Sequence, residues 1–153
     1  MKMPAQQRGT SKQDYGTPPV FLDAVRRKFG PLVCDLAARA DNAKCYLFIP
    51  PEVDSLAQDW NAIEHEVDGY FWLNPPFANI APWAKKARGL PVLMLVPASV
   101  GSRWFAEHVY PFARVYALTP RLTFEGCTQP YPKDCILCDF SAEPGFEVWD
   151  WRK

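Results

Sequence analysis

Short apolar runs alternate along the chain with segments of helical periodicity. Runs of this kind predict strands at 32–36, 46–49, 70–73, 92–96, 114–118, 135–140 and 147–151. The run Val92–Val96 is the most apolar, which is typical of a strand buried on both faces, so it is predicted to lie near the centre of a sheet. The chain therefore supplies enough strands for one large sheet.

Helices are predicted between several of these runs. Thr17 is expected to cap the first helix, with Pro18 in its first turn and Gly30 after its end. Its apolar residues share one face: Phe21, Val25 and Phe29. Further helices are predicted at 79–88 and 102–110, and Ser55-x-x-Gln58 is expected to be a capping box that opens a short helical turn.

The order of these elements predicts an α/β fold. Strands alternate with helices first, and later strands follow strands, which favours a mostly parallel sheet with helices on both faces and an antiparallel C-terminal end. The runs 135–140 and 147–151 are expected to close the sheet as a hairpin. Residues 1–14 are polar and aperiodic, so we predict a flexible tail before a single domain at 15–153.

Composition bears on the location of the protein, the state of its cysteines and metal binding. No apolar run approaches the roughly 18 residues of a membrane span, so we expect a soluble cytoplasmic protein with no membrane partner. Five scattered cysteines favour reduced thiols over a disulfide framework. Cys135 and Cys138 fall in one predicted strand and should face opposite sides, and His65 and His108 stand alone, so no metal site is expected.

Charge is unevenly distributed although the formal net charge is zero. The segment 50–70 holds six acidic residues and no Lys or Arg, whereas 79–121 holds six basic residues and one acidic residue. Such runs often form solvated faces, but the basic one is also a candidate surface for the phosphates of a nucleic acid. The candidate phosphate contacts are Lys85, Lys86, Arg103 and Arg121.

The tetrad Asn74-Pro75-Pro76-Phe77 is the most informative motif because it follows the predicted strand 70–73 directly. Two successive prolines cannot continue a sheet ladder, so the chain must turn out of the sheet and leave Asn74 at its rim. Open α/β sheets bind ligands at that rim. A side-chain oxygen, main-chain carbonyls and an aromatic ring together suit a planar amine.

Several motifs in order along the chain resemble the phage-type DNA N6-adenine methyltransferase family. They are Thr17-Pro18, Asp35-Leu36-Ala37-Ala38 with Asn42, Leu56-x-x-Asp59-Trp60, the tetrad, Pro97 and Arg121-Leu122-x-Phe124. The resemblance implies a Rossmann-like sheet, S-adenosylmethionine as methyl donor, DNA as substrate and no metal. The tetrad alone also marks methyltransferases of cytosine N4, RNA bases and protein glutamine.

The resemblance also implies roles for single residues. Asn74, Pro75, Pro76 and Phe77 would form the catalytic element, in which Asn74 and the Pro75 carbonyl hold the amine and Phe77 stacks on a flipped base. The implied cofactor residues are Thr17, Pro18, Asp35, Ala37, Asn42, Asp54, Asp59 and Trp60. Asp59 is favoured over Asp54 as the contact to ribose or adenine because Trp60 follows it.

Some alternatives stay open at this point. Many methyltransferases have glycines where this chain has Ala37 and Ala38, and alanine limits how closely the backbone approaches a ligand. Thr17 has a second interpretation as a helix cap, Trp60 as a core aromatic residue, and Asn42 as the end of a short helix. A catalytically silent nucleic-acid-binding module would keep the same fold, and a homodimer on DNA is compatible with the sequence without being required by it.

Overall fold

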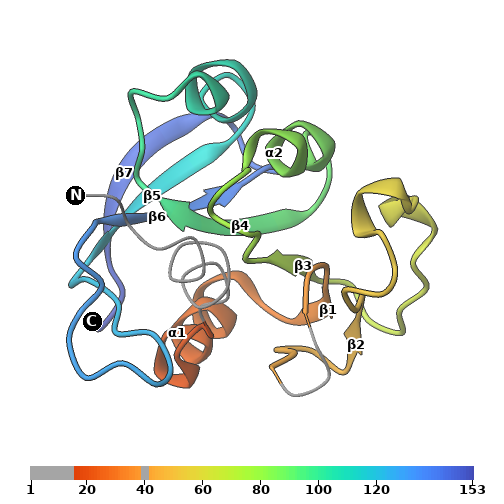
Figure 1. The fold of residues 1–153 in the computed structure, drawn as a ribbon, viewed down its shortest axis with the longest axis horizontal. Coiled ribbons are helices and arrows are strands. Elements are labelled where there is room, and N and C mark those ends of the chain that lie inside the picture. Colours follow the sequence, from red (N-terminus) through yellow and green to blue (C-terminus); the bar gives the residue numbers. More distant parts are fainter. Residues whose placement is uncertain (1–15, 39–41) are drawn as a thin grey trace, which may run out of the picture.

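The computed structural model describes residues 16–38 and 42–153, so the predicted tail at 1–14 lies outside the described residues. A seven-stranded sheet runs through the molecule in the order β2-β1-β3-β4-β6-β5-β7 (Figure 1). Its strands are β1 (Leu32–Asp35), β2 (Leu47–Phe48), β3 (Tyr70–Leu73), β4 (Val92–Pro97), β5 (Arg114–Thr119), β6 (Cys135–Asp139) and β7 (Gly145–Asp150). The strands lie where the apolar runs predicted them.

The sheet is mostly parallel, with its antiparallel pairs towards the C-terminus, as predicted. Strand β6 runs antiparallel to both β4 and β5, and every other pair is parallel. The predicted hairpin of the last two strands is wrong, because β7 pairs with β5 at the sheet edge. All five residues of β6 are buried and need neighbours on both sides, whereas Phe146 and Val148 of β7 are exposed, as suits an edge.

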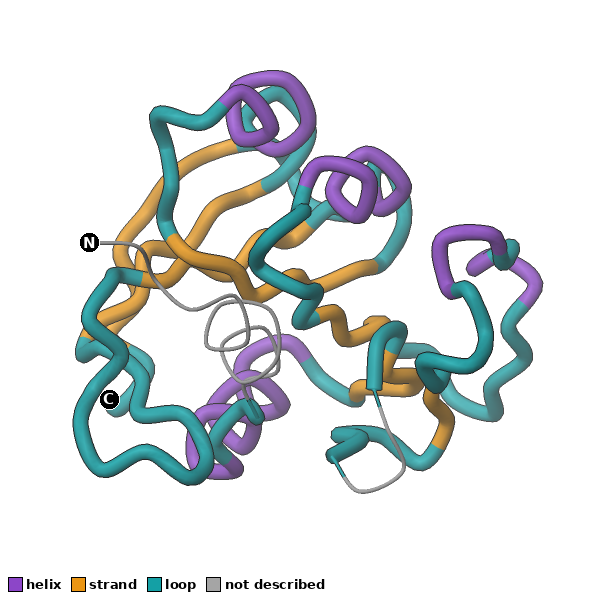
Figure 2. Tube along the Cα trace, in the orientation of Figure 1, coloured by secondary structure: helices purple, strands orange, loops and turns teal. Residues whose placement is uncertain are grey.

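Helices cover both faces of the sheet, as predicted. The helix α1 (Pro19–Phe29) lies on one face, and α2 (Ala81–Ala87) with the π-helical turn η4 (Phe105–Val109) lies on the other (Figures 1 and 2). Successive residues of β3 enter separate cores, Phe71 on the α2 side and Trp72 on the α1 side. Because successive side chains of a strand point to opposite faces of the sheet, β3 contributes to the cores on both faces.

Two capping predictions are wrong. Pro18 occupies the N-cap position of α1, and the buried Thr17 lies one residue before it. The proline ring has no oxygen that could accept from the helix, so α1 has no side-chain cap bond. Between β2 and β3 run two 3-10 turns, η2 (Ser55–Ala57) and η3 (Trp60–Ala62), and the caps are Asp54 and Asp59. Each carboxylate accepts from the backbone N–H two residues on, the local bond that a short acidic side chain makes readily.

The cysteines are arranged as the strand pattern predicted. Cys135 belongs to the core on the α1 side and Cys138 to the core on the α2 side, so the two thiols face away from each other. All five cysteines are free, and burial raises the pKa of Cys135 to about 12. Within residues 16–38 and 42–153, no three His, Cys, Asp or Glu side chains are grouped to hold a metal ion. No helix in that part is long and apolar enough to cross a bilayer.

Candidate active site

The loops after three parallel strands meet at one edge of the sheet, because β1, β2 and β3 all point the same way. They enclose a cavity of about 290 Å³, called here the Asn74 cavity. The loop after β1 contributes Ala37, Ala38 and Asn42, and the loop after β3 contributes Asn74 and Pro76. The segment after β2 and the helix α2 supply the remaining lining residues: Ile49, Pro50, Pro51, Val53, Asp54, Ser55 and Trp83.

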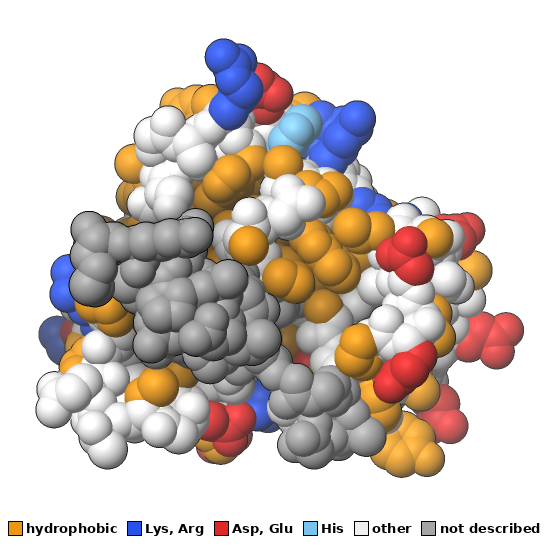
Figure 3. All heavy atoms as spheres, in the orientation of Figure 1, with side chains coloured by type: hydrophobic (Ala, Val, Ile, Leu, Met, Phe, Trp, Pro, Cys, Tyr) orange, Lys and Arg blue, Asp and Glu red, His pale blue; other side chains and the backbone are white. Residues whose placement is uncertain are grey.

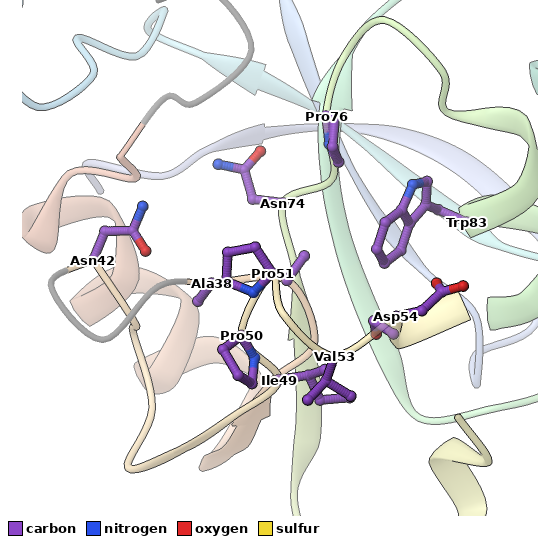
Figure 4. A pocket seen from close by; sticks show the side chains of 12 residues that line it. Ala38, Asn42, Ile49, Pro50, Pro51, Val53, Asp54, Asn74, Pro76 and Trp83 are labelled. Atoms are coloured by element: carbon purple, nitrogen blue, oxygen red, sulfur yellow. The ribbon is translucent and has the colours of Figure 1, made fainter. Parts of the chain in front are cut away.

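Figure 4 shows how the side chains lie around the Asn74 cavity. Asn42 lies at the left and Trp83 and Asp54 lie at the right, with Asn74 and the two prolines of the β2 loop, Pro50 and Pro51, between them. The lining is mostly apolar with a few polar groups, which is the usual composition of a small-molecule site. The predicted placement of Asn74 at the sheet rim is confirmed.

Asn74 is held by a residue that is distant in sequence. Its amide Nδ2 donates a hydrogen bond to the Thr17 hydroxyl Oγ1 over 3.3 Å. Thr17 is only 1 % exposed, so this hydrogen bond lies beneath the surface. The sequence predicted a site role for both residues but not their contact, because a hydrogen bond across 57 positions has no local signal.

Asp35 supports the loop that lines one side of the cavity. Its carboxylate is buried and accepts hydrogen bonds from the backbone N–H groups of Ala37 (3.2 Å) and Lys44 (3.0 Å). Burial raises the pKa of Asp35 to about 6, against the lowering effect of these N–H groups and of the Lys44 charge. Asp35 is not among the lining residues, so its observed contacts fold the loop that carries Ala37, Ala38 and Asn42.

Of the two acidic cofactor candidates, Asp54 lines the Asn74 cavity and Asp59 does not. Asp59 borders a neighbouring hollow of about 440 Å³, which shares Ile49, Pro50 and Val53 with the first. The structure thus brings both carboxylates to the β2 loop, but only Asp54 lies beside the cavity that Asn74 borders.

Trp60 is a core residue, 1 % exposed, whose indole Nε1 donates to the Ser55 hydroxyl. Its ring stacks on Trp83 at 6.3 Å, and Trp83 is the aromatic residue that reaches the cavity. Sequence reasoning missed Trp83 as well as Pro50 and Pro51. A signal existed for the prolines, since Pro50-Pro51 follows an apolar run as Pro75-Pro76 does.

Phe77 lies beside two other aromatic rings instead of lining the cavity. Its ring centroid is 6.4 Å from that of Phe124 and 6.1 Å from that of Tyr131. All three rings belong to the core on the α1 side or pack against it. The tetrad therefore has Asn74 and Pro76 at the cavity and Phe77 in an aromatic cluster with Phe124 and Tyr131.

The four cations predicted to meet phosphates do not gather at one place. Lys85 is exposed on α2, and Lys86 lies 5.1 Å from the Trp60 ring. Arg103 pairs with Glu107 at 2.9 Å, and Arg121 pairs with Asp134 at 2.8 Å in the loop after β5: both ion pairs are exposed. Figure 3 shows one group of basic side chains over α2 and η4 and others on the opposite side of the molecule, whereas most of the visible acidic side chains lie over the segment between β2 and β3.

Comparison with known families shows to which family this chain belongs. Residues 5–134 match the family described as "DNA N-6-adenine-methyltransferase (Dam)". The chain belongs to this family. The matched region contains every residue of the Asn74 cavity and Thr17, so the resemblance noted from the motifs is confirmed. Strands β6 and β7 of this Dam-family chain follow the matched region.

Two individual relatives are consistent with the Dam family. The chain is 34 % identical over 80 residues to "Putative methyltransferase YfdM" of Escherichia coli (strain K12), which covers 52 % of this chain and 84 % of that protein. It is 32 % identical over 77 residues to "DNA N-6-adenine-methyltransferase" of Haemophilus phage HP1 (strain HP1c1), which covers 46 % of this chain and 41 % of the relative. No solved structure matches the chain.

Proposed function

We propose that this protein transfers a methyl group from S-adenosylmethionine to the N6 amino group of adenine in DNA. The observation that carries the proposal is the position of Asn74, directly after β3, at a cavity that the loops after β1 and β2 also line, in a chain of the Dam family. The parallel order β2-β1-β3-β4, followed by an antiparallel strand between β4 and β5, supports a Rossmann-like methyltransferase sheet.

The residues of the Asn74 cavity fit the proposed cofactor. Its volume of about 290 Å³ is near the lower end of typical small-molecule sites, and Trp83 and the prolines offer flat apolar surfaces for a purine. The Asp54 carboxylate accepts one hydrogen bond from the Leu56 N–H, and its remaining lone pairs can accept from ribose hydroxyls. Asn42 and the backbone around Ala37 would bind the amino-acid end. S-adenosylmethionine supplies the methyl group when bound there.

Thr17, Pro18 and Asp35 keep supporting roles in the proposal. Asp35 would act through the loop that its carboxylate folds, because this carboxylate accepts hydrogen bonds from the backbone N–H groups of Ala37 and Lys44. Thr17 contacts Asn74 through its hydroxyl, and Pro18 follows it as the N-cap residue of α1. Asp59 and Trp60 would act behind the cavity, through the neighbouring hollow and the stacked Trp83 ring.

The amine would be activated by acceptors of the tetrad. The lone pair of an adenine amino group is delocalised into the ring, so the nitrogen is a poor nucleophile. Hydrogen bonds from its N–H groups to the Asn74 oxygen and the Pro75 carbonyl would draw the nitrogen towards a pyramidal shape. The carboxamide of Asn74 cannot act as a base, so the amine proton would leave to solvent after the methyl group has been transferred.

The target base would have to leave the duplex to reach Asn74. Flipping costs about a few kcal/mol, and stacking on one aromatic ring such as Phe77 returns roughly 1–3 kcal/mol. Phosphate contacts would supply the rest, and the candidates remain Lys85, Lys86, Arg103 and Arg121. The ion pairs of Arg103 and Arg121 would have to exchange their carboxylates for phosphates.

The test is methyl transfer to DNA with product analysis. The purified protein is incubated with unmethylated DNA and S-adenosylmethionine labelled on the methyl group, and the DNA is digested to nucleosides. We expect the label in N6-methyladenine, formed about 10²–10³-fold more slowly by Asn74→Ala. Label on cytosine, in RNA or in protein would reject the adenine assignment. If no acceptor is labelled, the melting temperature is compared with and without S-adenosylmethionine. A rise would mean that the cofactor binds and that the DNA supplied lacks the target, whereas no rise would indicate a silent module without a cofactor site.

A further inference from the structure

The contact between Thr17 and Asn74 joins the start of α1 to the residue at the rim of β3. Asn74 Nδ2 donates to Thr17 Oγ1 over 3.3 Å, and Thr17 is 1 % exposed. A carboxamide has a donor branch and an acceptor branch of nearly the same shape, so a neighbour that bonds one branch decides where the other points. The residue that engages the amide nitrogen therefore also sets the direction of the amide oxygen.

Thr17 is itself firmly placed. Pro18 follows it with φ at −65°, and α1 begins at Pro19, so the chain direction after Thr17 is fixed. On the other side the carbonyl of Gly16 accepts the Glu125 N–H over 2.9 Å. A Cβ at position 16 would meet the Glu125 side chain. Because Thr is β-branched, its hydroxyl has few rotamers once the backbone is held.

We propose that Thr17 is a positioning residue for Asn74: its hydroxyl accepts the amide N–H and thereby turns the amide oxygen towards the amine to be methylated. This inference rests on the proposed function, since the amine enters only there. It assigns Thr17 a role different from a direct cofactor contact, which the family resemblance implied.

The two roles predict different kinetic changes. A positioning residue affects the methyl-transfer step and leaves cofactor affinity unchanged, because the cofactor does not touch it. A cofactor contact affects the dissociation constant instead. Thr17→Val removes the hydroxyl at nearly constant shape, and Thr17→Ser keeps the hydroxyl and removes only the methyl group.

The experiment measures single-turnover methyl transfer at saturating cofactor and DNA, together with binding of S-adenosylhomocysteine by calorimetry. We expect Thr17→Val to slow transfer about 10–100-fold, because misplacement of a reacting group has effects of this size. Its dissociation constant should stay within about twofold, and Thr17→Ser should recover most of the rate. Melting temperatures check that both variants are folded.

Two results would overturn the inference. One is a normal transfer rate in Thr17→Val, and the other is a rate loss that saturating cofactor restores, which would make Thr17 a cofactor contact. A second readout does not need activity. The side-chain NH₂ signals of Asn74, assigned by their loss in Asn74→Ala, should shift in Thr17→Val and stay in place in Thr17→Ser.

This second readout also separates the two proposals. The proposed function is contradicted by wild-type protein that labels an acceptor other than adenine, or that labels none and is not stabilised by S-adenosylmethionine. Unchanged Asn74 NH₂ signals in Thr17→Val contradict the inferred contact whether or not the protein is active.

Discussion

The two halves of the sheet are built differently. In the half β2-β1-β3-β4 all strands are parallel, so the loops after β1, β2 and β3 meet at one edge and line the Asn74 cavity. In the other half, β6 runs against its neighbours and is buried along its whole length. Its last residue, Asp139, accepts a hydrogen bond from the Tyr70 hydroxyl at 2.8 Å, at the end of β3 remote from Asn74.

We expect this difference in strand direction to separate residues needed for activity from residues needed for stability. Parallel strands bring several loops to one place, whereas an antiparallel strand contributes its connection at the opposite edge. Substitutions around the cavity should therefore alter activity in a folded protein, and substitutions in β6 should alter folding with little effect on the activity of folded molecules. The four predictions below test this separation.

Leu137→Ala should cause the largest loss of stability. Leu137 is fully buried in the middle of β6, and truncation of such a side chain costs about 2–5 kcal/mol. Denaturant titration measures the loss. The matched control is Val148→Ala on β7, where the side chain is 68 % exposed and the cost should be below about 0.5 kcal/mol. Equal costs would mean that β6 is not the structural support described here.

Asn74→Ala should cause the largest loss of activity. Removal of one preorganised polar group of this kind lowers turnover by about 10²–10³. Melting temperature and cofactor affinity should change little, because Asn74 is half-buried at the cavity edge. Asn61→Ala, an exposed asparagine in η3, is the control and should behave as wild type. A parallel loss of cofactor affinity would assign Asn74 to maintenance of the fold.

The sequence predicted the strands well for a physical reason. Apolar runs such as 92–96 need burial in any arrangement, so their positions are decided locally, and the proline pair placed Asn74 at the rim. Which strands pair with each other was harder to predict. The position of β6 depends on which strands need two neighbours, and the wrong hairpin came from sequence proximity alone.

The site was predicted in part for the same reason. Residues next to strand ends, such as Asn74 and the Ala37 loop, follow from the chain path. Other features depend on packing between distant parts of the chain. Trp83 and not Trp60 lines the cavity, Asp54 and not Asp59 lines it, and Thr17 contacts Asn74. No local pattern distinguishes these.

Asp35→Asn should alter the dependence of stability on pH. The folded-state pKa of Asp35 is raised from 3.8 to about 6, so its proton is bound more tightly in the folded protein. Its contribution to stability is present below pH 3.8 and is lost as pH rises through about 6. Relative to Asp35→Asn, wild type should lose on the order of 2–3 kcal/mol across this window. Unfolding free energies at several pH values measure it, and parallel curves would contradict the raised pKa.

Asp54→Asn should have the smallest effect. We expect the dissociation constant for S-adenosylhomocysteine to rise about tenfold, because one charged hydrogen bond is lost. Asparagine still caps η2, so folding should be unchanged. Asp59→Asn is the matched control, because Asp59 caps η3 in the same way but lies outside the Asn74 cavity. A larger effect at Asp59 would restore the assignment that the sequence favoured.

The most direct measurement is a crystal structure with S-adenosylhomocysteine bound. We expect the ligand to occupy the Asn74 cavity, with its purine against Trp83 or the Pro50-Pro51 pair, its ribose at Asp54 and its sulfur directed towards Asn74. A ligand bound elsewhere on the protein, or bound in the cavity with its sulfur turned away from Asn74, would contradict this expectation.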